Sequence, residues 1–438
     1  MEVSVKNFGT LEEANVHIGG LTVITGENDT GKSTIGKILF SLVKAIARYE
    51  EDLEEDKEAR VTSIAEQLYF SLRRFINIAS HTELRDLFHP RKLYSQLRLD
   101  RKKAIQERML IIDNLRGTGL LPPSLHEQCI NNIQKIQIIM EEPDDQISAI
   151  NRAIRKSFFS EFKWEIIQKS LTTPGNASIN INDGASELID ISWTKDGIHT
   201  FNYSDDLGYV DATYVDSPAI MQFHHLVKMA RTLFDNADAS RLTVPLHVKD
   251  LAAKLSDSIY DFSAHPDLLT AEPNDDTISS KINAIFGGHI SYDADKIDFI
   301  LERNGYKLSS SNIASGIKSL GILDLLIKSG SVKSNSLLIL DEPEVNLHPR
   351  WQVDYCEIIC ELVSAGVDII VSTHSPYIIE ALKHFSEKSG VANTFYLAEK
   401  NPDTNLSKFE DITGRIDVAI DKLAAPLVRL NKDLFDDF

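Results

Sequence analysis

Apolar and polar residues alternate along the first 25 residues, and the pattern then changes to helical spacing. EVSVKNF, ANVHIGG and LTVIT, separated by turns around Gly9 and Gly19, have the alternation and β-branched content of short strands. LTVIT is apolar enough for a buried strand. After a glycine-containing turn, the apolar residues of IGKILFSLVKAI recur at the spacing of an α-helix. The start of the chain therefore predicts a strand–turn–helix unit of an α/β domain.

A different pattern covers residues 47–170. The charge run YEEDLEEDKEAR precedes VTSIAEQLYFSLRRFINI, whose apolar residues have helical spacing, and helical pattern continues with breaks at prolines and glycines. This segment predicts a helical lobe without the long heptad run of a coiled coil. Residues 171–287 then carry SINI, ELIDISWT, IHTFNYS and DATYVDS, followed by helical stretches. We expect these four stretches to form an antiparallel sheet.

The last third of the chain, residues 288–438, returns to a mixed pattern. HISYDADKIDFILERNGYKLSSS predicts a hairpin or meander, and SSSNIASGIKSLGILDLLIKSG predicts a Ser/Gly turn that opens a helix. SLLIL and VDIIVS are apolar, β-branched runs that predict two further buried strands. Residues 416–430 have apolar side chains at helical spacing, which predicts a C-terminal helix.

Composition narrows the class of protein. The chain has 438 residues, 42% of them hydrophobic and 25% charged, which is typical of a globular protein with room for two or three domains. A formal net charge of −19 argues against a general nucleic-acid coat. Three cysteines form neither a disulfide framework nor a metal-ligand spacing. There is no apolar signal segment and no apolar run of the ~20 residues that span a membrane, so we expect a cytoplasmic protein.

The run GENDTGKST, residues 26–34, fits the phosphate-binding pattern G-x-x-x-x-G-K-[ST]. A strand, a glycine turn and a helix N-terminus together direct backbone N–H groups at an anion. Lys32 supplies a cation for the outer phosphates, and Ser33 offers a hydroxyl to a metal ion. The alternative, a chance glycine-rich turn, does not explain the flanking strand and helix. The candidate nucleotide-binding residues are Gly26, Asn28, Gly31, Lys32, Ser33 and Thr34.

Two adjacent carboxylates, Asp341 and Glu342, end the predicted strand SLLIL. The carboxyl ends of parallel strands are where α/β folds place their sites. Asp341 suits holding Mg²⁺, directly or through water, and Glu342 suits polarising an attacking water. The alternative is an ordinary strand end followed by a helix cap.

His374 follows the next predicted strand, within STHS. A histidine at this position can hydrogen-bond a γ-phosphate or its leaving oxygen, although by itself it would be interpreted as structural. Ser315 and Gly316 begin the helix after the Ser/Gly turn, and a helix N-terminus attracts anions.

These motifs, in this order, resemble the ATP-binding-cassette (ABC) class of ATPases. VKNFGTLEEANVHI, LTVITGENDTGKST and DEPEVNLHP are similar to the SMC-like, non-transporter branch, which includes RecF and OLD-type ATPases and ATPases of bacterial anti-phage systems. The resemblance implies an α/β fold: an ABC-type P-loop NTPase head with a mixed-sheet core and a helical insertion lobe. Residues 1–46 and 288–438 would form the head, residues 47–170 the insertion and residues 171–287 a connecting region.

The same resemblance implies the cofactors and roles. ATP and Mg²⁺ would bind together, with Ser33 and Asp341 at the metal and Glu342 and His374 as catalytic residues. Ser315 and Gly316 would contact the nucleotide of a second copy, so the protein would be a homo-oligomer with ATP between its heads. The signature here reads ASGI, with Ile317 where a second glycine is usual. This departure implies slow hydrolysis.

Only 64 residues follow His374, too few for the Toprim nuclease that OLD-type proteins carry there. We therefore expect a separate effector protein, for which a Toprim-type nuclease is a candidate. The length and single ATPase module resemble the ATPase component of two-gene PARIS or Septu systems. The leading hypothesis is an oligomeric ATP-hydrolysing sensor or scaffold that controls this effector in anti-phage defence. The alternatives are a RecF-like DNA-repair ATPase and a structural scaffold with little turnover.

The segment 73–108 is basic within an acidic chain. It holds ten Lys or Arg against four acidic residues, a net charge of +6. One interpretation is neutralisation of the acidic run just upstream. The other is a docking surface for DNA, RNA or an acidic protein.

Overall fold

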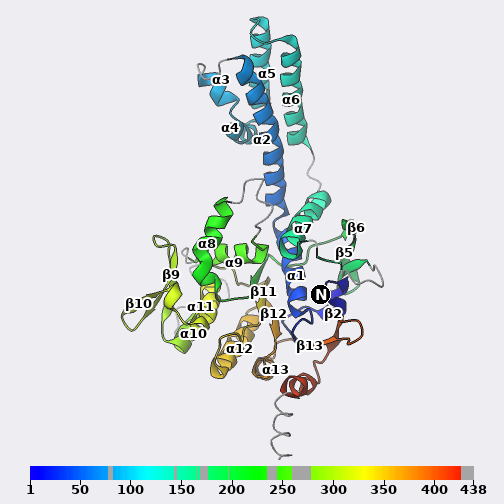
Figure 1. The fold of residues 1–438 in the computed structure, drawn as a ribbon, viewed down its shortest axis with the longest axis vertical. Helices are drawn as coiled ribbons and strands as arrows, with labels where there is room; N and C mark the ends of the chain where they lie inside the picture. The colour runs from blue at the N-terminus through cyan, green and yellow to red at the C-terminus, as the bar shows by residue number, and fades with distance from the viewer. Residues whose placement is uncertain are drawn as a thin grey trace, which may run out of the picture. The chain divides into compact units, whose positions relative to one another are not determined.

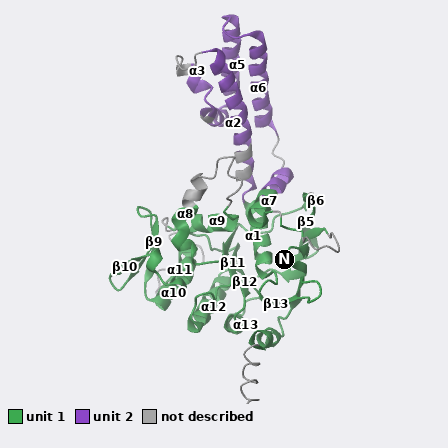
Figure 2. Ribbon diagram, viewed as in Figure 1, with its two compact units in different colours: residues 1–47, 154–438 green, residues 48–153 purple. Residues whose placement is uncertain are grey.

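The computed structural model describes residues 1–76, 82–142, 146–163, 165–167, 176–195, 197–233, 244–258 and 278–425. The chain divides into two compact units (Figure 2). The larger unit contains residues 1–47 and 154–438, and the smaller one contains residues 48–153.

The larger unit is built on a mixed sheet, for which the described residues supply eleven strands (Figure 1). In sheet order the strands are β6 (Gly197–Tyr203), β5 (Ser186–Thr194), β4 (Ala177–Asp183), β1 (Glu2–Phe8), β2 (Leu11–His17), β14 (Ser407–Asp411), β13 (Asn393–Lys400), β3 (Leu21–Gly26), β12 (Asp368–Thr373), β11 (Ser336–Asp341) and β7 (Asp211–Val215).

Five neighbouring strands, β13, β3, β12, β11 and β7, run parallel. Their apolar runs are explained by burial on both faces. On β11, Leu338 and Leu340 belong to one core, whereas Ile339 faces Gly36 of α1 (Lys32–Ala47). A Cβ at Gly36 would lie 2.8 Å from the Ile339 Cγ2 atom, so glycine lets α1 approach the sheet closely. All five strands end at one edge of the sheet, here called the carboxyl edge.

The remaining strands form a wing in which β6, β5, β4, β1 and β2 pair antiparallel in series. The antiparallel pairing expected for β4, β5 and β6 is confirmed. It is wrong for β7, which lies at the other end of the sheet and pairs parallel with β11. Ala212, Thr213 and Tyr214 of β7 are all buried, because α1 and α9 (Leu246–Asp257) contact this strand. The segment 171–287 therefore contributes strands to the same sheet as the phosphate-binding run.

The other face of the parallel strands is covered by helices that form the main core. The remaining elements of the larger unit are α8 (Ile220–Leu233), α10 (Ile278–Phe286), α11 (Ser315–Lys328), α12 (Pro349–Ser364), α13 (Pro376–Ser389) and the antiparallel meander β8 (His289–Asp293), β9 (Asp298–Arg303) and β10 (Tyr306–Ser309). The meander is confirmed. The helix expected over 416–430 is present over 417–425, and its remainder lies outside the described residues.

The smaller unit is helical, with its own apolar core. It contains α2 (Tyr49–Phe75), α3 (Thr82–Leu87), α4 (Pro90–Leu99), α5 (Arg101–Gly117), α6 (Pro123–Glu141) and the first part of α7 (Gln146–Phe162). Among the described residues, no helix combines the length and hydropathy that a membrane crossing needs.

Four charged side chains, of which Lys44, Asp250 and Lys254 are buried, join α1, β7 and α9. The Lys44 Nζ lies 2.5 Å from Asp211 Oδ1 and 2.6 Å from Asp250 Oδ1, and Lys254 Nζ lies 2.8 Å and 3.0 Å from the same two carboxylates. Burial raises the pKa of Asp211, but Lys254 and Lys44 outweigh it, so the net shift is downward. Two cations and two anions therefore neutralise each other in a largely buried cluster.

We predict that Lys44→Met destabilises the protein by about 3–5 kcal/mol, because Asp211 and Asp250 are left to share a single cation, Lys254. The free energy of unfolding from urea titrations measures this loss. Lys6→Met is the control: Lys6 pairs with Glu13 in solvent, and its removal should change stability by no more than about 0.5 kcal/mol. Equal effects of the two substitutions would contradict the structural role of the buried cluster.

Candidate functional site

The phosphate-binding run forms the loop between β3 and α1. Gly26 and Gly31 have φ values of 145° and 80°, which favour glycine. A Cβ at Gly26 would lie 2.3 Å from the Ala398 carbonyl oxygen, and one at Gly31 would lie 2.5 Å from Leu11 Cδ2. Both glycines are therefore required by conformation and by space. Asn28 is exposed in this loop, and the Thr34 amide donates to the Gly31 carbonyl over 3.1 Å in the first turn of α1.

Lys32 is buried beneath the loop, with 5% of its surface exposed. Its Nζ donates to the Glu27 carbonyl oxygen over 2.6 Å, within the loop itself. Burial lowers the pKa of Lys32, and the negative charges of Glu342, Asp341 and Glu344 oppose this shift. The ammonium group thus lies in the field of three carboxylates from the carboxyl edge.

Asp341 lies beside the phosphate loop at the end of β11. The Ser33 Oγ donates to Asp341 Oδ1 over 2.9 Å, and the Ser372 Oγ donates to the same oxygen. The Tyr214 hydroxyl donates to Asp341 Oδ2 over 2.7 Å. Burial, followed by the charge of Asp341, raises the pKa of Tyr214 well above its usual value. Three hydroxyl groups from three elements therefore fix the orientation of this carboxylate.

Glu342 and His374 contact each other at the same edge. The His374 Nε2 lies 2.6 Å from Glu342 Oε1, and its Nδ1 lies 2.8 Å from the Gly26 carbonyl oxygen. Both partners, a carboxylate and a carbonyl oxygen, are hydrogen-bond acceptors. Glu342 has a φ of 51°, a sparsely populated region, and its amide donates to the Ser372 carbonyl over 2.8 Å. The strand end therefore directs Glu342 at His374 rather than along the sheet.

Glu344 is a site residue that the sequence analysis did not identify. Its Oε1 accepts hydrogen bonds from the Thr373 hydroxyl over 2.8 Å and from the His374 amide over 2.6 Å. It thereby holds the backbone that carries His374. Its position in DEPE, two residues after Glu342, is the only local signal that points to it.

The structure does not bring Ser315 and Gly316 to the loop of their own chain. Ser315 is exposed at the start of α11, and Gly316 packs against Trp351 and the Asn346 carbonyl, which would lie 3.0 Å from a Cβ. In the part of the chain that the structure describes, no hydrogen bond joins either residue to residues 26–34. Ile317, the departure from the usual signature, is 8% exposed and belongs to the main core.

The donor groups fit a metal that arrives with a nucleotide. Within the described ranges, no cluster of three His, Cys, Asp or Glu could hold a metal ion alone. Mg²⁺ usually takes one or two protein oxygens together with phosphate oxygens and waters. The Ser33 hydroxyl and the Asp341 carboxylate, 2.9 Å apart, are such a pair of oxygen donors.

His247 on α9 is a second residue that the sequence analysis did not identify. Its backbone amide and Nδ1 lie 2.8 Å and 2.7 Å from the two Glu161 carboxylate oxygens, and its Nε2 lies 3.3 Å from Asp216 Oδ2. Burial disfavours the charged ring, but the hydrogen bonds to Asp216 and Glu161 outweigh it and raise the pKa of His247 to about 9. The three residues come from distant parts of the sequence, so no local pattern predicts them.

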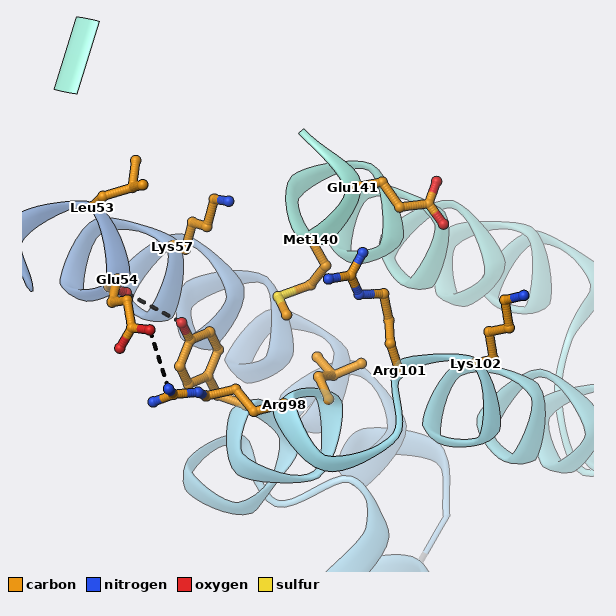
Figure 3. A pocket seen from close by; sticks show the side chains of 10 residues that line it. Leu53, Glu54, Lys57, Arg98, Arg101, Lys102, Met140 and Glu141 are labelled. Atoms are coloured by element: carbon orange, nitrogen blue, oxygen red, sulfur yellow. Dashed lines mark hydrogen bonds and ion pairs between the residues drawn. The ribbon is translucent and has the colours of Figure 1, made fainter. Parts of the chain in front are cut away.

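The basic segment lies in the smaller unit, where α2, α4, α5 and α6 line a groove of about 520 Å³ (Figure 3). Arg98 pairs with Glu54 over 3.1 Å, which is the expected neutralisation of the acidic run. Arg101 and Lys102 also line the groove. Arg108 is buried and bonds to the carbonyls of Ala104 and Leu87, so counting it in a docking surface was wrong.

The strand order and the loop define the class of fold. A parallel sheet flanked by an antiparallel wing, with the phosphate loop after β3 and Asp341 at the end of β11, is that of an ABC-type P-loop NTPase head with a helical insertion. This confirms the predicted fold class.

A comparison with protein families matches part of the chain. A family described as "AAA domain, putative AbiEii toxin, Type IV TA system" matches residues 211–380, which include β7, α11, Asp341, Glu342 and His374. No curated protein matches the chain.

Several solved SMC heads align over most of their length. The SMC head domain from Thermotoga maritima is 12% identical, with a TM-score of 0.39, covering 94% of this chain and 97% of that one. The Smc head with an extended coiled coil, bound to a ScpA domain from Pyrococcus furiosus, is 13% identical, with a TM-score of 0.42, covering 96% and 97%. At TM-scores below 0.5, the strand order and the residues at the carboxyl edge remain the basis for the fold.

We predict that stability falls as the pH rises past His247. A pKa raised from 6.5 to about 9 stabilises the folded state fully below pH 6.5, and this contribution is lost as the pH rises through 9. The loss is about 3 kcal/mol. Urea titrations from pH 6 to pH 10 should show this fall in wild type and a smaller one in His247→Gln. Identical profiles for wild type and His247→Gln would contradict the prediction.

Proposed function

We propose that this chain binds ATP with Mg²⁺ at the carboxyl edge and hydrolyses it. The observation that carries the proposal is the contact between Ser33 and Asp341, which joins the phosphate loop to an acidic strand end. A loop that needs two glycines, a buried lysine and a helix N-terminus suits a polyphosphate. We name ATP as the nucleotide because the fold is that of ATPases, and not because of a particular contact to the base.

Each residue has a role that follows from its contacts. Lys32 would exchange the Glu27 carbonyl for an outer phosphate oxygen, which gives it a stronger, charge-assisted bond. Ser33 and Asp341 would hold Mg²⁺, which neutralises phosphate charge when bound. Glu342 would orient the attacking water, and His374 would donate a hydrogen bond to the γ-phosphate from the place where it now meets Glu342.

A second copy completes the proposed site. Ser315 is exposed, and among the described residues no hydrogen bond joins it to the loop of its own chain, so its helix N-terminus is available to the nucleotide of another copy. We therefore propose a homo-oligomer with ATP between two heads. Because Ile317 packs into the core, the signature offers less backbone to a phosphate than a second glycine would. This supports slow turnover, and it also favours the alternative of an ATP-dependent scaffold.

At the cellular level we propose a sensor or scaffold that controls a separate effector protein in anti-phage defence. The description of the family that matches residues 211–380 names a putative toxin of a Type IV toxin–antitoxin system. This description supports a role in defence. A Toprim-type nuclease remains our candidate effector. The groove beside Arg101 and Lys102 is the candidate surface for an acidic protein or a nucleic acid.

Two substitutions test the proposal. Glu342→Gln should keep ATP binding, slow hydrolysis by about a hundredfold or more, and accumulate an ATP-bound oligomer, because the group that orients water is lost.

Lys32→Ala should weaken ATP binding by at least about tenfold, because it removes the buried cation. Phosphate release, nucleotide titration and sizing with ATP measure the three effects.

Lys37→Ala, on the same helix but outside the loop, is the matched control and should bind ATP as wild type does. Wild-type affinity in a folded Lys32→Ala protein would refute the nucleotide site. Wild-type hydrolysis by a monomeric Glu342→Gln protein would refute the role given to Glu342.

A further inference from the structure

A line of buried contacts leads from Asp341 away from the nucleotide site. Its first member is Tyr214, a fully buried residue on β7 whose hydroxyl is bonded to Asp341 Oδ2 over 2.7 Å. The other carboxylate oxygen is bonded by Ser33 and Ser372. Tyr214 is thus the hydroxyl donor that holds Oδ2, and it comes from neither nucleotide-binding motif.

The next member is His247. Its ring centroid lies 5.0 Å from that of Tyr214, and the Phe40 ring packs edge-on against both, at 6.1 Å from Tyr214 and 6.4 Å from His247. The position of the tyrosine ring is therefore set by the histidine on one side and by α1 on the other. In a close-packed interior, a shift of either neighbour displaces the hydroxyl group.

The last member is Glu161 on α7. Its side chain has no exposed surface, and both of its oxygens are bonded to His247, one to the backbone amide and one to Nδ1. The opposite ring nitrogen contacts Asp216, which follows β7 at the carboxyl edge. α7 runs from Gln146 to Phe162, so the same helix begins within the smaller unit and carries Glu161 in the larger one.

From this arrangement we propose that Tyr214 is a positioning residue for the metal-holding carboxylate Asp341. We further propose that His247 and Glu161 set the position of Tyr214, so that a displacement of α7 changes metal binding at Asp341. The inference rests on the proposed function, because it assigns Asp341 to Mg²⁺. It adds a route by which an event in the helical unit alters the nucleotide site.

The proposed coupling has a physical basis, because α7 cannot move independently of His247, to which its residue Glu161 is bonded. A buried carboxylate that loses two hydrogen bonds is left charged and unsolvated, so Glu161 and His247 move together. His247 in turn contacts Tyr214, on the strand next to β11, and Asp216, which directly follows that strand. The partners of metal ligands commonly influence metal affinity by 10–100-fold when they are removed.

The test measures Mn²⁺ binding in the presence of ATP. The readout is the loss of the electron paramagnetic resonance signal of free Mn²⁺. The full chain is compared as wild type, Tyr214→Phe, Glu161→Gln and the double variant. Tyr214→Phe removes one oxygen and should raise the Mn²⁺ dissociation constant about 10–100-fold, whereas ATP affinity in EDTA stays within about twofold of wild type. Glu161→Gln should raise it less, and the double variant should match Tyr214→Phe, because Glu161 acts through Tyr214.

Tyr209→Phe is the matched control. Tyr209 also donates a partly buried hydrogen bond to a carboxylate, Asp368 Oδ2, over 2.7 Å, but at the amino-terminal end of β12. It should leave Mn²⁺ affinity unchanged. If Glu161→Gln fails to fold, His247→Gln takes its place in the cycle.

Three outcomes would overturn the proposal in different ways. A wild-type chain without ATP-dependent Mn²⁺ binding would refute the proposed function and this inference with it. Normal wild-type binding with equal effects of Tyr214→Phe and Tyr209→Phe would refute only the role of Tyr214. Additive effects in the double variant would refute only the connection from Glu161 to Tyr214.

Discussion

The structure depends on an electrostatic constraint at the carboxyl edge of the parallel strands. Asp341, Glu342 and Glu344 lie beside a loop shaped for a polyanion, and their charges act on the buried Lys32. Carboxylates and phosphates repel each other at short range, more strongly where water is excluded. Only cations allow the two to share a site. Lys32 and the N-terminus of α1 supply positive charge, and the proposed Mg²⁺, held by Ser33 and Asp341, would supply the rest.

The strand order makes this arrangement possible. Ser33 and Asp341 are 308 residues apart in sequence, yet β3 and β11 are separated by a single strand, β12. β7 adds Tyr214 from the other side of β11. In the sequence, the helical unit, residues 48–153, lies between the loop and the residues Tyr214, Asp341 and His374. The site therefore forms only when distant parts of the chain come together.

The sequence predicts those residues whose role is visible in local spacing. Gly26 and Gly31 were predicted from the loop pattern, and Asp341 was predicted from its place after a buried strand. Tyr214 was not predicted, because its contact with Asp341 depends on β7 lying parallel to β11. The alternation in DATYVDS is equally suited to an antiparallel wing. His247 and Glu161 were not predicted because their contact spans 86 residues. Arg108 was wrongly placed on a surface, because its charge alone does not reveal that it is buried and bonded to backbone carbonyls.

The most direct test of the account is the structure of Glu342→Gln with ATP and Mg²⁺, determined by crystallography or cryo-electron microscopy. The account predicts phosphates on the loop of residues 26–34, with the metal bound to the Ser33 hydroxyl and directly or through water to Asp341. It also predicts Ser315 of a second copy beside the γ-phosphate. A nucleotide bound elsewhere, or a loop that stays empty at saturating ATP, would contradict it.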